Sequence, residues 1–142
     1  MKFPWTWMTV ASSALLMGGW DVDPRTQADL HLPVRPGTDL PLALALGAAL
    51  LERGHADLEF LAAHASGLDR YRERAAAWSI PRAAEVCGLE VAVIEELLAR
   101  YVAASPAVVR CGWGPERNRN GGSATAAILA LPAIAGKFGV RG

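Results

Sequence analysis

The sequence has no surplus of charge of either sign, because 14 lysines and arginines balance 14 aspartates and glutamates. A surface for nucleic acid or for an anionic membrane needs an excess of basic residues. We therefore expect no nucleic-acid partner. The chain also lacks internal repeats and low-complexity tracts, and its 142 residues, 52% of them hydrophobic, are enough for one domain with a modest core.

Cysteine is scarce as well. Cys87 and Cys111 are far apart in the sequence and belong to no CxxC pattern, so neither a zinc site nor an iron–sulfur cluster is indicated. The three histidines have no serine, cysteine or carboxylate at a recognisable catalytic spacing. We therefore assign no catalytic residue and no metal ligand, and we expect both cysteines to be buried free thiols.

Residues 1–19 form an atypical apolar segment, in a stretch that carries no charge from Phe3 to Trp20. A signal peptide needs more basic residues than Lys2, and a membrane span needs about 20 strongly apolar residues. Pro4 and the Gly18-Gly19 pair interrupt this segment. We expect a poorly packed helix or a disordered arm rather than an anchor, and a cytoplasmic location, with periplasmic or membrane-associated locations as alternatives.

Patterns typical of helices fill most of the remaining chain. Helices are predicted at residues 40–53, 57–64, 68–78, 79–88, 90–104 and 123–135. Short strands are predicted near Val22, at His31–Val34 and at Val108–Cys111. Strands that alternate with helices favour crossover connections, so the expected fold class is α/β, rich in helix, with a few short parallel strands.

Two tight turns each hold a carboxylate close to an arginine on loop-prone backbone. Asp23 and Arg25 lie in the DPR turn, and Gly37, Thr38 and Asp39 end the RPGTD turn. An aspartate can accept hydrogen bonds from the N1–H and the N2 amino group of guanine together. The alternative interpretation is that Asp23 only initiates a turn and that Thr38 or Asp39 only caps a helix.

A glycine-rich connection leads from the predicted strand at Val108–Cys111 to the last predicted helix. It contains Gly112, Gly114, Arg117 and a glycine pair, and such a loop lets backbone N–H groups approach an anion at the start of a helix. It matches neither a Walker motif nor GxGxxG. Arg117 could meet a phosphate or pterin oxygen, and a solvated loop is the alternative.

In combination, these segments resemble the molybdopterin oxidoreductases of the formate dehydrogenase, nitrate reductase and DMSO reductase type. The resemblance covers roughly residues 20–142 and rests on DPR, ADLHLPVRPGTD, FLAAH and RCGWGPERNRNGGSATAAILALPAIAGKFGVRG. It implies that residues 20–142 are part of an α/β domain that binds molybdopterin guanine dinucleotide. The cofactor-binding residues that it implies are Asp23, Arg25, Gly37, Thr38, Asp39, Gly112, Gly114 and Arg117.

The resemblance also implies what would lie outside this chain. The family's iron–sulfur segment, its molybdenum-ligand region and its C-terminal domain have no counterpart in the sequence, so the expected function is that of a partial catalytic subunit, inactive alone. Its expected partners are the molybdopterin cofactor and the missing parts of the enzyme or other subunits. The alternative is a noncatalytic helical interaction module derived from such an enzyme.

Overall fold

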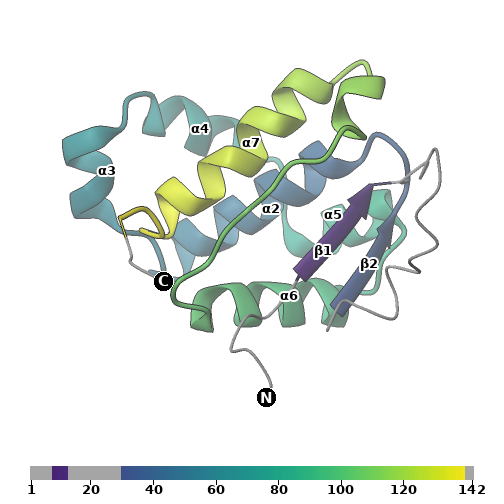
Figure 1. Cartoon of the computed structure of the whole chain (residues 1–142), viewed down its shortest axis with the longest axis horizontal. Helices are drawn as coiled ribbons and strands as arrows, with labels where there is room; N and C mark the ends of the chain where they lie inside the picture. Colours follow the sequence, from purple (N-terminus) through teal and green to yellow (C-terminus); the bar gives the residue numbers. More distant parts are fainter. Residues whose placement is uncertain (1–7, 13–29, 140–142) are drawn as a thin grey trace.

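The computed structural model of the protein describes residues 8–12 and 30–139 (Figure 1). The elements are β1 (Met8–Ser12), β2 (Leu30–Val34), α2 (Asp39–Glu52), α3 (Leu58–His64), α4 (Leu68–Ala75), α5 (Ile80–Cys87), α6 (Val91–Ala103), the short 3-10 helix η1 (Pro115–Arg117) and α7 (Gly121–Ile134). The prediction of a helix-rich α/β fold is confirmed.

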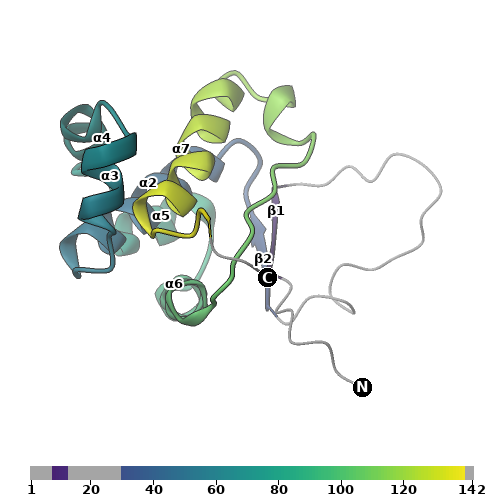
Figure 2. The same ribbon diagram turned by 60° about the vertical axis from the view of Figure 1, so that its left-hand side comes forward.

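Helix α2 lies at the centre of the molecule, and α7 runs beside it in the same direction (Figures 1 and 2). Alanine and leucine occupy most of α2, and every residue from Pro41 to Leu50 is buried. Because α2 is apolar on all faces, it needs cover on all sides. This cover comes from α4, α5 and α7, while α6 packs against α5 and α3 packs against α7.

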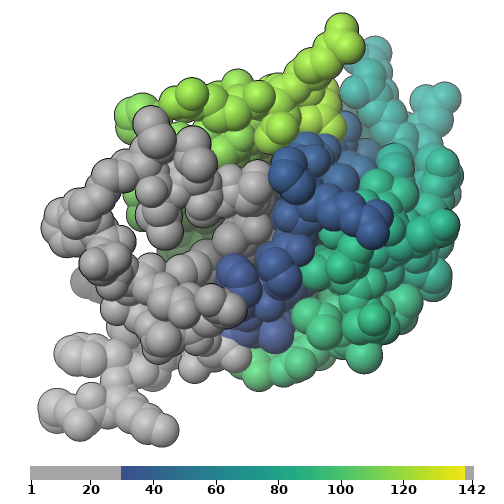
Figure 3. Space-filling view, turned by 90° about the vertical axis from the view of Figure 1, so that its right-hand side faces the viewer, coloured from purple at the N-terminus to yellow at the C-terminus, as the bar shows by residue number. Residues whose placement is uncertain are grey.

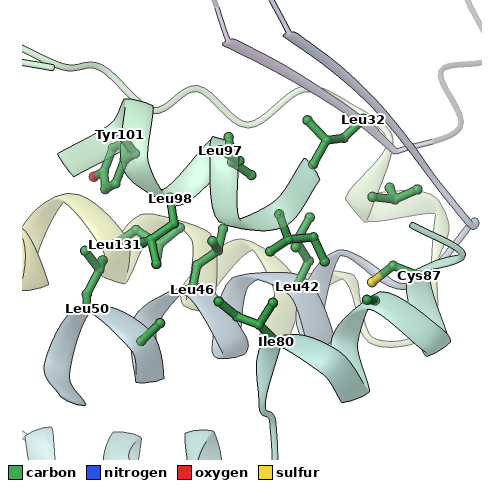
Figure 4. Packing of buried hydrophobic residues seen from close by; sticks show 14 of the residues in the cluster. Leu32, Leu42, Leu46, Leu50, Ile80, Cys87, Leu97, Leu98, Tyr101 and Leu131 are labelled. Atoms are coloured by element: carbon green, nitrogen blue, oxygen red, sulfur yellow. The ribbon is translucent and has the colours of Figure 1, made fainter. Parts of the chain in front are cut away.

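The largest core cluster joins β2, α2, α5, α6 and α7 (Figure 4). Leu42, Leu46 and Leu50 follow one another at four-residue spacing on α2, so they line one face of this helix. Leu32 of β2 and Ile94 of α6 are fully buried in the same cluster. Burying a side chain of this size contributes about 1.5–3 kcal/mol, so this cluster supplies much of the stability.

The two described strands form a parallel pair in which Met8 lies opposite Leu30 and Ser12 lies opposite Val34. The predicted strand at residues 31–34 is thus confirmed. The expectation of a helix or a disordered arm at the N-terminus is wrong for residues 8–12, which form β1. A parallel strand depends on a partner that is distant in the sequence, so local composition did not reveal it.

The predicted strand at Val108–Cys111 is wrong. This run forms no ladder within the described residues and instead crosses the molecule as a coil between α6 and η1 (Figures 1 and 2). β-Branched residues favour extended backbone, but a strand also needs a partner in register. Val108 is 85% exposed rather than buried. The strand predicted near Val22 lies outside the described residues.

Several helix boundaries follow the signals read from the sequence, while α4 ends at Ala75 rather than at Trp78 and α7 begins at Gly121 rather than at Ser123. Asp57 begins α3 by accepting a hydrogen bond from the backbone N–H of Phe60, at 2.8 Å. Ser79 begins α5 by accepting one from the backbone N–H of Arg82, at 3.3 Å. Gly54 after α2 and Gly88 after α5 adopt the positive φ that ends a helix. These local capping residues set the starts of α3 and α5 and the ends of α2 and α5.

Candidate functional site

The RPGTD turn connects β2 to α2 and is held against the end of α5. The backbone N–H of Arg35 donates to the carbonyl of Cys87 at 3.0 Å, and its guanidinium donates to the carbonyl of Glu85 at 3.1 Å. Those carbonyls belong to the last turn of α5, where the helix supplies no backbone N–H donors for them. The fold therefore fixes the position of this turn through a helix that lies 50 residues further along the chain.

Within the turn, Thr38 does not cap α2 with its side chain. Its Oγ1 donates to the carbonyl of Arg35 at 2.6 Å, and its backbone N–H donates to the same carbonyl at 3.1 Å. Gly37 has a φ of 79°, a conformation that glycine adopts without strain. The interpretation of Thr38 as a side-chain cap is therefore wrong.

Asp39 occupies the first turn of α2 and is only 6% exposed. A carboxylate there is favoured by the helix dipole. Its negative charge also acts electrostatically on the thiols of Cys87 and Cys111. Burial raises the pKa of the Cys111 thiol, and the Asp39 carboxylate raises it further. Burial likewise raises the pKa of Cys87, whose thiol donates to the carbonyl of Thr38 at 3.4 Å.

The glycine-rich loop folds back on itself before α7. The carbonyl of Gly114 accepts hydrogen bonds from the backbone N–H of Arg117, at 3.2 Å, and from the side-chain amide of Asn118, at 3.3 Å. Gly121 packs so closely on this loop that a Cβ atom there would overlap the carbonyl oxygen of Pro115. The start of α7 can therefore lie directly on η1.

The turn and the loop meet at Gly37. The side-chain amide of Asn120 donates to the carbonyl of Gly37 at 3.1 Å, joining residues 83 positions apart. Asn118 Oδ1 lies 3.4 Å from where a Cβ of Gly37 would be. Sequence reasoning missed both asparagines, although a polar residue directly before a glycine pair and a helix is a recognisable signal.

Helices α2 and α7 therefore both begin at one end of the molecule, beside the carboxyl ends of β1 and β2 (Figure 1). In the space-filling view, the blue segment that holds the RPGTD turn lies against the lime-green segment of η1 and the start of α7 (Figure 3). Neither α2 nor α7 has a side-chain cap among the described residues. Two parallel helix dipoles with adjacent positive ends favour an anion there.

The structure thus unites Gly37, Thr38 and Asp39 with the loop that contains Gly114. Gly112 and Arg117 lie on the same loop and are exposed. Asp23 and Arg25 lie outside the described residues. In the part of the chain that the structure describes, no three histidine, cysteine or acidic side chains are grouped to hold a metal ion. In that same part, no helix has the length and apolar character needed to cross a membrane.

Comparison with known proteins adds a second kind of evidence. No family model matches the chain. It is 32% identical over 111 residues to a probable oxidoreductase, YoaE, of Bacillus subtilis, and 30% identical over 121 residues to trimethylamine-N-oxide reductase of Haemophilus influenzae. Each match covers 78% of this chain. The structure of acetylene hydratase from Pelobacter acetylenicus matches 81% of this chain with a TM-score of 0.75 and 28% identity.

The chain is homologous to the molybdopterin oxidoreductases. Its resemblance to that family, read from RPGTD and the late glycine-rich segment, is thereby confirmed. Molybdopterin oxidoreductases of this group are molybdenum-containing enzymes, which supports a molybdenum cofactor in the family. The chain spans only 16% of YoaE, 14% of the trimethylamine-N-oxide reductase and 16% of the acetylene hydratase chain.

Proposed function

We propose that this chain forms part of the site for molybdopterin guanine dinucleotide in a molybdopterin-dependent oxidoreductase, and that it binds the guanosine end. The observation that carries this proposal is the buried carboxylate of Asp39 at the common start of α2 and α7. The site lies at the carboxyl ends of parallel strands, where open α/β sheets bind nucleotides.

Asp39 has the chemistry needed to recognise guanine. Its two carboxylate oxygens can accept hydrogen bonds from the N1–H and the N2 amino group in parallel. Adenine presents an acceptor at the corresponding position, so the carboxylate would repel it. Because Asp39 is buried, water competes little with a base for its carboxylate, which strengthens the selection.

The two helix starts suit the phosphates of the dinucleotide. Thr38 and Asn120 both occupy cap positions, yet neither side chain caps its own helix among the described residues. The first backbone N–H groups of a helix need acceptors, and phosphate oxygens can supply them. Gly121 carries no Cβ, so η1 packs directly on the start of α7, and the Asn120 side chain links that start to the carbonyl of Gly37. These features fit the diphosphate group of a dinucleotide.

We assign supporting roles to the other residues indicated by the sequence. Asp23 would assist Asp39 at the guanosine, while Arg25 and the loop that contains Gly112, Gly114 and Arg117 would approach the phosphates and the pterin. The bound cofactor would supply a molybdenum ion that changes oxidation state. The protein's part would be to position the cofactor, and we expect no turnover by this chain alone.

Calorimetric titration of the purified chain with GDP tests the proposal. Hydrogen bonds to a charged group contribute about 1.5–3 kcal/mol, so Asp39→Ala should weaken GDP binding at least about tenfold. Asp39→Asn is the sharper variant, because it keeps the size of the side chain and presents donors to the donors of guanine. ADP should bind the wild type more weakly than GDP.

Asp69→Asn is the matched control, since Asp69 lies on α4 with a side chain that is 99% exposed. This variant should bind GDP as the wild type does. Equal GDP affinity in the wild type and in Asp39→Asn would refute the role of Asp39. Failure of the wild type to bind any guanine nucleotide would refute the proposed function of this chain.

A further inference from the structure

Asn120 occupies the N-cap position of α7 but does not act as its cap. Asparagine is favoured at this position because its side-chain oxygen can accept a hydrogen bond from the first turn of the helix. Here no such bond forms, and the side-chain nitrogen donates to the carbonyl of Gly37 at 3.1 Å. The favoured local interaction is absent, and a bond to a distant turn takes its place.

The bond from Asn120 is accepted by a carbonyl of the turn that carries Asp39. Gly37 lies two residues before Asp39, and the carbonyls of its neighbours in the turn also have partners. That of Arg35 accepts from Thr38, and that of Thr38 accepts from the thiol of Cys87. The bond from Asn120 thus ties the turn to α7, while the other bonds tie it to α5 and to itself.

We propose that Asn120 is a positioning residue, which holds Asp39 at a set distance from the start of α7 so that base recognition and phosphate binding occur in one site. This inference rests on the proposed function. It assigns to Asn120 an effect on the nucleotide that acts through Asp39, without direct contact between Asn120 and the base.

Asn120→Ser separates this role from helix capping. Serine is about as good an N-cap as asparagine, and it is uncharged, so α7 and the local electrostatic potential should change little. Its hydroxyl is too short to replace the amide that reaches Gly37. Arg53→Met is the control for a general loss of stability, because it removes the ion pair between Arg53 and Glu95 near the other end of α2.

The first measurement needs no ligand. Loss of one hydrogen bond should make amide exchange two- to tenfold faster in residues 38–42 of Asn120→Ser, while α6 keeps its wild-type exchange. Arg53→Met should leave exchange at residues 38–42 unchanged. Unchanged exchange at the start of α2 in Asn120→Ser would overturn the inference, whatever the chain binds.

The second measurement is a double-mutant cycle on GDP affinity. Asn120→Ser should weaken GDP binding about two- to tenfold in the wild-type background and less than about twofold in the Asp39→Asn background. Equal losses in both backgrounds would overturn the inference. Faster exchange at residues 38–42 combined with no GDP binding by the wild type would support the link and refute the proposed function.

Discussion

Adjacent glycines at the start of α7 should respond in opposite ways to the same substitution. A Cβ atom on Gly121 would overlap the carbonyl oxygen of Pro115, which is backbone and cannot rotate away. A Cβ atom on Gly122 would meet nothing within 4 Å. We therefore expect Gly121→Ala to force η1 away from α7, and Gly122→Ala to be accepted without rearrangement.

The difference in the free energy of unfolding between the two variants follows from two opposing effects. Overpacking a buried position typically costs about 1–3 kcal/mol. Alanine stabilises a helix interior relative to glycine by up to about 1 kcal/mol, and less in the first turn. Gly121→Ala should thus lower the free energy of unfolding by roughly 1–3 kcal/mol, because the overlap outweighs the helix preference. Gly122→Ala should leave it unchanged or raise it by up to about 1 kcal/mol.

Urea denaturation of the wild type and both variants, followed by circular dichroism, measures these changes. The pair of variants controls for composition, because each replaces one glycine with one alanine in the same helical turn. If Gly121→Ala is as stable as Gly122→Ala, the close packing of η1 on α7 is not present. Gly121 would then have no role in shaping the site.

Two further predictions concern the surroundings of α2. The hydroxyl of Tyr71 is buried against Gly47 without a hydrogen-bond partner among the described residues, and burial raises the pKa of Tyr71 to about 12. Tyr71→Phe should therefore raise the free energy of unfolding by about 1 kcal/mol in urea denaturation, and a loss of stability would show that this hydroxyl is satisfied. Hydrogen bonds from Arg53, at 2.6 and 2.8 Å, lower the pKa of Glu95 below 4.5, so the stability from this pair is present above pH 4.5 and is lost as pH falls through the lowered pKa. Both side chains are partly exposed, so thermal denaturation should show a small effect, under about 1 kcal/mol, that salt weakens and that Arg53→Met abolishes.

Several helices could be predicted because their signals are local. Asp57 and Ser79 lie at the starts of α3 and α5, and each accepts a hydrogen bond from its own first turn. Gly88 ends α5 through its own backbone conformation. Such signals act within a few residues, so they can be read from the sequence without knowledge of the fold.

The strands depended on partners that local sequence does not specify. Residues 8–12 form β1 because residues 30–34 lie beside them, while Val108–Cys111 has a composition typical of strands but no ladder in the described structure. Parallel pairing joins backbone groups that are distant in the sequence, so composition indicates extended backbone without deciding whether a sheet forms.

For the candidate site too, some features could be predicted from the sequence and others depended on the tertiary structure. The sequence by itself indicated the RPGTD turn, the glycine-rich loop and the family resemblance, because these depend on residue types and short spacings. Only the tertiary structure joined them, since parallel packing of α2 and α7 brings Asn120 within 3.1 Å of Gly37. It also decided that the side chain of Asn120 bonds to Gly37 instead of capping α7. A side chain with several possible partners takes the one that the fold places within reach, and that choice is made by contacts across the whole chain.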